Sequence, residues 1–232
     1  MRRTRCAARA LCLTAFESEI PMSHCIVIGG GITGVTSAYA LARDGHQVTL
    51  ASGEVVSGDA VVVCAGVHSR ALGAQLGDRL NVYPVKGYSI TVMLNDEQSQ
   101  AAAPQVSLLD DETKLVTSRL GVDRFRVAGT AEFNGFNLDI RADRIRPLVD
   151  WVNQCFPGVS TRRVEPWAGL RPMMPDMLPR VGPGRKGNVF YNTGHGHLGW
   201  TLSAITAHQL TEHVSQWAST RHPAPVVALT PA

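Results

Sequence analysis

Three glycines, Gly29, Gly31 and Gly34, are spaced as G-x-G-x-x-G directly after the apolar, β-forming run 26–28. The pattern of residues 35–43 predicts a helix, and that of residues 47–50 predicts a second strand. In this strand–turn–helix–strand context the spacing indicates dinucleotide binding. The first glycine permits a tight turn, the second lets a pyrophosphate approach the backbone, and the third lets helix and strand pack closely. The N–H groups and positive dipole end of the helix would bind the phosphates, whereas the alternative is a glycine-rich turn without a ligand.

A second glycine-rich turn, residues 194–199, follows a predicted strand at 189–192 and precedes a predicted amphipathic helix at 201–217. The same dipole argument applies at this helix start. An ordinary strand-to-helix turn is the alternative interpretation.

The residues between the two turns predict mostly β-structure. Strand patterns cover 61–64, 82–92, 106–110, 115–118 and 125–129, and the later ones favour an antiparallel sheet. Residues 68–76 predict a short helix. Apolar residues at three- and four-residue spacing predict a helix over 139–156, which Pro147 is expected to bend or to start. The fold class is therefore α/β, with a Rossmann-like layer and an antiparallel sheet.

The connection over residues 51–60 is unusual, because parallel strands need a crossover of about a dozen residues or more. Gly53 and Gly58 would break a helix there, so we expect half of a β-hairpin that leads into the strand at 61–64. A segment between Leu50 and Ala51 is expected to be missing.

The bulk composition excludes several classes of protein. The 232 residues carry a net charge of +3 and no Lys/Arg block beyond the first few residues, so nucleic acid is not an expected partner. No apolar run approaches the ~20 residues of a membrane-spanning helix. The five cysteines form no C-x-x-C pair, which favours a reducing compartment. Residues 1–22 are expected to be a disordered extension. Their composition favours a translation start placed too far upstream over a functional targeting presequence.

Five segments together resemble FAD-dependent amine oxidoreductases of the D-amino acid oxidase-like superfamily, especially the bacterial D-amino acid dehydrogenase (small subunit) group. The segments are IVIGGGITGVTSAYALARDGHQVTL, DAVVVCAGVHSRAL, YPVKGYSITV, WAGLRPMMPDMLPRVG and NTGHGHLGWTL. The resemblance implies oxidative deamination of D-amino acids to 2-oxo acids and ammonia, with FAD as cofactor. It also implies electron transfer to a quinone or another non-oxygen acceptor. The expected location is cytoplasmic, with peripheral attachment to the bacterial inner membrane left open.

The resemblance assigns three groups of residues to FAD. The turn at the pyrophosphate would comprise Gly29, Gly31, Ile32, Thr33 and Gly34. The turn near the adenosine would comprise Ala65 and Gly66. The residues against the flavin ring and ribityl chain would be Gly194, Gly196, Leu198, Gly199, Trp200 and Thr201.

The resemblance assigns Arg171 to the substrate carboxylate, which its planar guanidinium suits; a structural ion pair is the alternative. Tyr88 and Lys86 lie on a strand expected near the substrate, with a half-buried sheet position as an equal alternative. No general base is required, so His195 and His197 are assigned to turn packing or to the flavin surroundings.

Two departures from the family pattern stand out. The second strand does not end in the acidic residue that would bind the adenosine ribose. Glu54 has the expected spacing of 20 residues after Gly34, but its neighbours are typical of a turn and not of a strand end. Family members also carry a much longer segment before DAVVVCAG. The expected domains are an FAD-binding domain (23–80 and 181–218), a substrate-side β-sheet domain (81–180) and a tail (219–232).

Three alternatives remain open. One is an amine oxidase of the same superfamily acting on glycine, sarcosine or proline-like substrates. Another is an NAD-binding protein, against which the second glycine turn argues. The third is a non-catalytic remnant that lacks the internal block.

Overall fold

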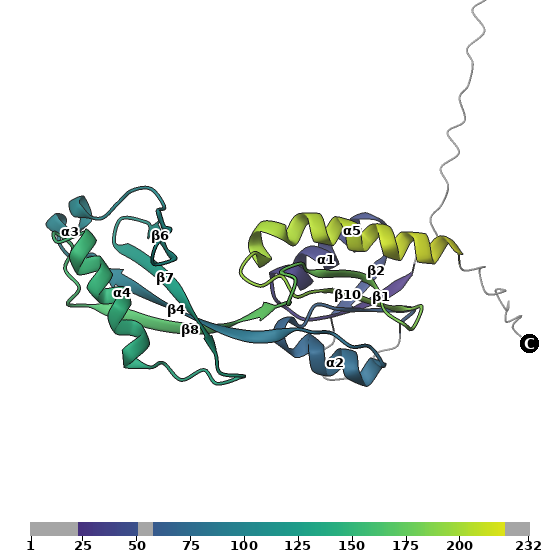
Figure 1. Cartoon of the computed structure of the whole chain (residues 1–232). Helices are drawn as coiled ribbons and strands as arrows, with labels where there is room; N and C mark the ends of the chain where they lie inside the picture. The colour runs from purple at the N-terminus through teal and green to yellow at the C-terminus, as the bar shows by residue number, and fades with distance from the viewer. Residues whose placement is uncertain (1–22, 51–57, 221–232) are drawn as a thin grey trace, which may run out of the picture.

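The computed structural model describes residues 23–50 and 58–220, which form two lobes (Figure 1). The first lobe contains a five-stranded sheet in the order β2-β1-β3-β10-β9. Its strands are β1 (His24–Ile28), β2 (Gln47–Leu50), β3 (Ala60–Val63), β9 (Arg180–Pro183) and β10 (Val189–Thr193). The first four strands in that spatial order are parallel, and β9 pairs antiparallel with β10.

Helices cover both faces of this sheet, as expected for parallel strands. α1 (Ile32–Arg43) and α5 (Gly199–Thr220) pack side by side on one face, where Leu41 and Leu210 are completely buried. On the other face lie the short 3-10 turn η1 (Gly66–His68) and α2 (Ser69–Leu76). There Val63, Val82 and Tyr191 form a separate core cluster.

The second lobe is an antiparallel sheet in the order β5-β6-β7-β4-β8. Its strands are β4 (Tyr83–Met93), β5 (Leu109–Asp110), β6 (Leu115–Leu120), β7 (Arg124–Phe133) and β8 (Val164–Met173). One face packs against α4 (Ala142–Cys155) around Ile90, Phe125 and Leu148, while α3 (Glu97–Ala102) lies at the end of the lobe. In Figure 1, β4 and β8 run together from this lobe towards the first one.

These observations confirm the predicted α/β class with a truncated Rossmann-like layer and an antiparallel sheet. Among the described residues, no helix combines the length and the apolar character that crossing a bilayer requires.

Several element boundaries differ from those predicted. The expected strand over 106–110 is only Leu109–Asp110, and Pro147 lies inside α4 rather than at its start. α4 continues through the proline because its apolar face packs on the sheet, where Leu148 and Val152 are completely buried. The sequence patterns did not predict α3, β8 or β9. The expected hairpin over 51–60 falls mostly outside the described residues, and β3 begins at Ala60.

Candidate cofactor-binding site

The two glycine turns line one cleft, although about 160 residues separate them in the sequence. The cleft has a volume of about 530 Å³ and opens at the carboxyl ends of the parallel strands. β10 lies beside β3, and β3 lies beside β1, so the turns that follow β1 and β10 are brought together. The residues that line the cleft are Gly29, Gly30, Gly31, Ile32, Thr33, Cys64, Ala65, Gly66, Val67, His68, Leu170, Pro172, Gly194, His195, Gly196 and Gly199.

Glycine is required in the first turn for two different reasons. Gly29 has φ +125°, and a Cβ there would overlap the carbonyl group of Cys64. A Cβ on Gly34 would overlap the carbonyl oxygen of Gly29, which the helix approaches closely. By contrast, a Cβ on Gly31 would meet no atom within 4 Å, because that position faces the open cleft. This pattern matches the three roles expected of the motif.

The start of α1 is free to bind an anion. Gly31 is the N-cap and offers no side-chain hydrogen bond, and no acidic residue occupies the first turn. The first N–H groups of this 12-residue helix therefore point towards a cleft that Ile32 and Thr33 also line. A diphosphate fits this arrangement.

The second turn is held by both lobes. Gly194 and Gly196 have φ +81° and +57°, which favours glycine at both positions. The Gly196 N–H donates to the Pro172 carbonyl of β8 at 2.9 Å. The buried His195 places Nε2 3.0 Å from the Thr206 hydroxyl, and burial lowers its pKa. His195 therefore packs the turn against α5, where burial disfavours the protonated form of its imidazole.

The structure brings most of the predicted cofactor residues together. Gly34 lies beneath the first turn, whereas Leu198, Trp200 and Thr201 do not line the cleft, and Trp200 is 81% exposed. The prediction missed the contributions of His68, which ends η1, and of Leu170 and Pro172, which lie on β8. Glu54 lies outside the described residues.

Arg171 lies next to the cleft, between the lining residues Leu170 and Pro172. Its side chain lies over Gly87 of β4, where a Cβ would overlap the guanidinium, and Nη1 donates to the Thr130 carbonyl at 3.0 Å. Burial lowers the pKa of Arg171, and no carboxylate of the described residues pairs with it.

The residue that holds Arg171 is itself unusual. Thr130 has φ +60°, a strained conformation for a β-branched residue, and its buried hydroxyl oxygen has no hydrogen-bond partner among the described residues. A half-buried cation without a counter-ion, beside an unpaired hydroxyl, is suited to an anionic ligand.

Tyr88 is not brought together with Arg171. Successive strand residues point to opposite faces, and the register pairs Arg171 with Val85, on the face opposite Tyr88. Tyr88 is buried in the core, and its hydroxyl donates to Glu132 at 2.6 Å. Lys86, on the same face, lies 3.1 Å from Glu132, and Arg141 lies 2.9 Å from it. This ionic cluster, in which Lys86 and Glu132 are buried and Arg141 is half-exposed, holds β4, β7 and the loop before α4 together.

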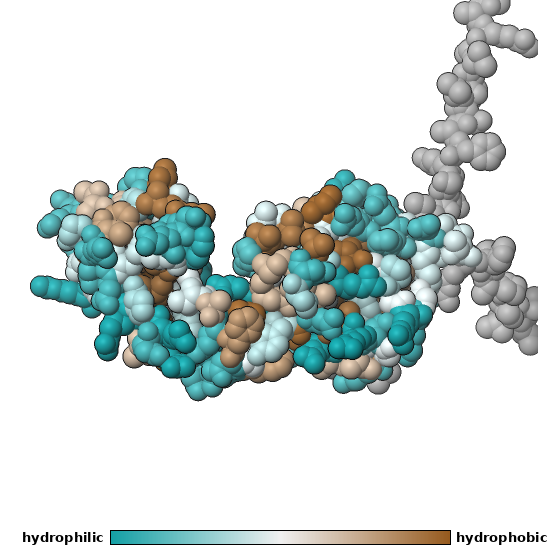
Figure 2. Space-filling model, viewed as in Figure 1, coloured by the Kyte–Doolittle hydropathy of each residue, from teal (hydrophilic) through white to brown (hydrophobic). Residues whose placement is uncertain are grey.

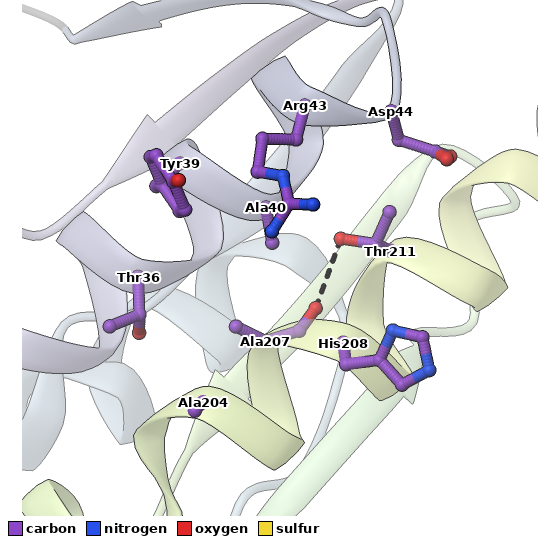
Figure 3. Close-up of a pocket in the computed structure, with 9 residues that line it drawn as sticks. All are labelled: Thr36, Tyr39, Ala40, Arg43, Asp44, Ala204, Ala207, His208 and Thr211. Carbon is purple, nitrogen blue, oxygen red and sulfur yellow. Dashed lines mark hydrogen bonds between the residues drawn. The ribbon is translucent and has the colours of Figure 1, made fainter.

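A second hollow of about 530 Å³ lies between the outer faces of α1 and α5 (Figure 3). Ala40, Ala204 and Ala207 line it, with Arg43 and Tyr39 at one rim. The Thr211 hydroxyl is already bonded to the Ala207 carbonyl at 3.0 Å. None of the predicted cofactor or substrate residues lines this hollow, so we do not identify it with the predicted site.

The chain is similar in sequence to several known proteins. The family model described as "FAD dependent oxidoreductase" matches residues 51–213. D-amino acid dehydrogenase 3 of Mesorhizobium japonicum is 62% identical over 174 residues, which are 75% of this chain and 41% of that protein. D-amino acid dehydrogenase of Xanthobacter autotrophicus is 42% identical over 188 residues, 77% of this chain and 44% of that protein.

Two solved structures share the fold. Glycine oxidase from Geobacillus kaustophilus matches with a TM-score of 0.64 and 22% identity, over 79% of this chain and 55% of that one. Iminodiacetate oxidase from Chelativorans matches with a TM-score of 0.63 and 20% identity, over 75% of this chain and 52% of that one.

The chain spans about two fifths of the length of the curated relatives, and is thus truncated relative to them. The family match begins at residue 51, directly after β2, and does not include the glycine motif at 29–34.

Proposed function

Because the chain belongs to the family of FAD dependent oxidoreductases, we propose that it carries the FAD-binding turns and the carboxylate-binding arginine of a D-amino acid dehydrogenase. The reaction is oxidative deamination of a D-amino acid, in which the imine product reacts with water to give a 2-oxo acid and ammonia. Electrons pass to a quinone or another non-oxygen acceptor, and the protein works in the cytoplasm or peripherally on the inner membrane.

Each group of residues has a separate task. The start of α1, with Gly29, Gly31 and Gly34 behind it, binds the pyrophosphate. Gly194, Gly196 and Gly199, with the start of α5, lie along the flavin portion. FAD, when bound, supplies the two-electron oxidation. Arg171 binds and orients the substrate carboxylate, and the nearby apolar side chains of Leu170 and Pro172 exclude water.

One observation carries the proposal: two glycine turns distant in sequence line a single cleft, and beside it lies the half-buried guanidinium of Arg171, which pairs with no carboxylate of the described residues. The relatives' names support the choice of a D-amino acid as substrate.

The test uses the purified full chain incubated with FAD and freed of excess cofactor. The proposal predicts a retained flavin absorption band that D-alanine bleaches under anaerobic conditions and L-alanine does not. Preferential bleaching by glycine or sarcosine would favour an amine oxidase of another specificity. A folded chain that retains no flavin would contradict the proposal and favour a non-catalytic remnant.

Arg171→Met tests the carboxylate contact. Since a charged hydrogen-bonded contact contributes about 1.5–3 kcal/mol, the variant should need roughly ten- to a hundredfold more D-alanine for half-bleaching. Arg163→Met, at an exposed arginine, is the matched control and should behave like the unaltered chain. Equal behaviour of the two variants would remove Arg171 from the substrate site.

A further inference from the structure

A second arginine, Arg126 of β7, lies on the same face of the second-lobe sheet as Arg171. The register pairs Arg171 with Val85 and Arg126 with Thr91 of β4, and side chains an even number of residues apart share one face of a strand. α4 packs on the other face. β4 and β8 join the two lobes across the hollow that Figure 2 shows between them.

The side chains of the two arginines lean towards each other over β4. The Arg171 guanidinium lies over Gly87, and Arg126 Nη2 donates to the Ser89 hydroxyl at 3.2 Å. Gly87 and Ser89 are two residues apart, which is about 7 Å along an extended strand. The two guanidinium groups are therefore on the order of 10 Å apart, with Ser89 almost completely buried beneath Arg126.

The indole ring of Trp167 lies beside the space between the two guanidinium groups. The ring lies over Gly169, which is the register partner of Gly87, and the Arg126 guanidinium is 5.4 Å from the ring centre. Trp167 is also 55% exposed. The indole thus supports Arg126 through a cation–π contact and still offers an apolar surface to a ligand.

The hollow around Arg126 has the chemistry of an anion site. Its volume is about 500 Å³, and its lining residues are Ser89, Thr91, Arg126, Glu165, Pro166 and Trp167. Across the two described ranges of the chain, no carboxylate forms an ion pair with Arg126, whereas Glu165 is paired with Arg163 at 3.7 Å. The Ser89 hydroxyl accepts from Arg126 and keeps its own proton for donation. A guanidinium and a hydroxyl donor together suit a carboxylate.

We propose that Arg126, with the hydroxyl groups of Ser89 and Thr91, forms a second carboxylate-binding subsite, which selects D-amino acids with an acidic side chain, such as D-glutamate. The α-carboxylate binds Arg171, the side-chain carboxylate binds Arg126, and the methylene groups between them pack on Trp167. Two carboxylates neutralise two guanidinium groups that otherwise repel each other. The choice of substrate rests on the proposed function, but the binding of a dicarboxylate by these two arginines does not require the flavin.

The first experiment compares D-glutamate with its uncharged equivalent, D-glutamine, in anaerobic bleaching of the FAD-loaded full chain. The unaltered chain should need at least tenfold less D-glutamate for half-bleaching, because a charged hydrogen-bonded contact is added. Arg126→Met should remove this preference. Arg124→Met, at an exposed arginine two residues away on β7 that is paired with Asp123, should keep it. An equal requirement for both amino acids, or a preference that survives in Arg126→Met, would overturn the proposal.

The second experiment separates the subsite from the flavin. Glutarate has two carboxylates at the spacing of D-glutamate, and pentanoate has one carboxylate on a chain of the same length. Calorimetric titration of the full chain without FAD should show glutarate binding at least tenfold more tightly than pentanoate. Arg126→Met and Arg171→Met should each remove the difference, and Arg124→Met should keep it.

The two experiments distinguish the two proposals. A chain that D-alanine bleaches but that binds glutarate and pentanoate equally would overturn the subsite and leave the proposed function standing. A chain that binds glutarate selectively through Arg126 but retains no flavin would support the subsite and contradict the proposed function.

Discussion

At the scale of single residues, the position of Arg171 depends on a glycine on the neighbouring strand. The guanidinium occupies the space where Gly87 would otherwise carry a side chain, and the Thr130 carbonyl holds it there. The sequence motif pointed to Arg171, but only the pairing of β4 with β8 reveals the role of Gly87.

Gly87→Ala should therefore impair substrate binding rather than folding. The added methyl group would displace the flexible end of Arg171, so we expect the D-alanine concentration for half-bleaching to rise about tenfold. Thermal unfolding should change little, since a side chain and not the backbone must move. Gly187→Ala, at a position with open space around it, is the control. An unchanged D-alanine requirement would show that the position of Arg171 is unimportant.

A second residue-scale prediction concerns acid stability. The hydrogen bond from Tyr88, aided by Lys86 and Arg141, holds the pKa of Glu132 below its usual range. Because the folded pKa is lower than the unfolded one, this stabilisation is complete above the usual glutamate pKa and is lost as the pH falls through the folded pKa.

Glu132→Gln should lower the free energy of unfolding at neutral pH and flatten its decline in acid, as measured by urea unfolding at a series of pH values. The control is Asp111→Asn, which breaks the exposed Lys114–Asp111 pair and should change little. An acid dependence equally steep in both variants would argue against the role of Glu132.

At the scale of elements, two glycines of the first turn have different roles: Gly34 is needed for packing of α1, and Gly31 for access of the ligand to the backbone. Gly34→Ala forces α1 away from the Gly29 carbonyl and should cost about 1–3 kcal/mol of stability. Gly31→Ala adds a methyl group to open space and should cost less than about 1 kcal/mol. Thermal or urea unfolding measures both, and a reversed order would contradict the packing described for this turn.

The same scale shows why some elements could be predicted and others not. β1, α1 and α5 have clear periodicity and glycine boundaries, so their positions followed from the sequence. β8 was missed because Pro166 and Pro172 argue against a strand, yet both are tolerated at a sheet edge, where β8 lies. Tyr88 looked like a substrate-side residue because periodicity alone does not show which face of a strand a helix covers.

At the scale of the whole molecule, the cleft exists because strand order brings two distant segments together. The glycine patterns indicated one nucleotide site, but the contributions of Leu170 and Pro172 depend on how the second lobe meets the first. The contact between the two lobes includes the stacking of His68 on Phe136, with ring centres 5.5 Å apart. No local pattern in the sequence encodes such a contact.

The central claim is that the turns at 29–34 and 194–199 form one site for FAD. Titration of the full chain with FAD, followed by quenching of flavin fluorescence, tests it most directly. The account predicts one FAD per chain, binding weakened about tenfold or more by Gly31→Ala, and binding unchanged by Gly187→Ala. Absence of saturable FAD binding, or equal binding by the unaltered chain and Gly31→Ala, would contradict it.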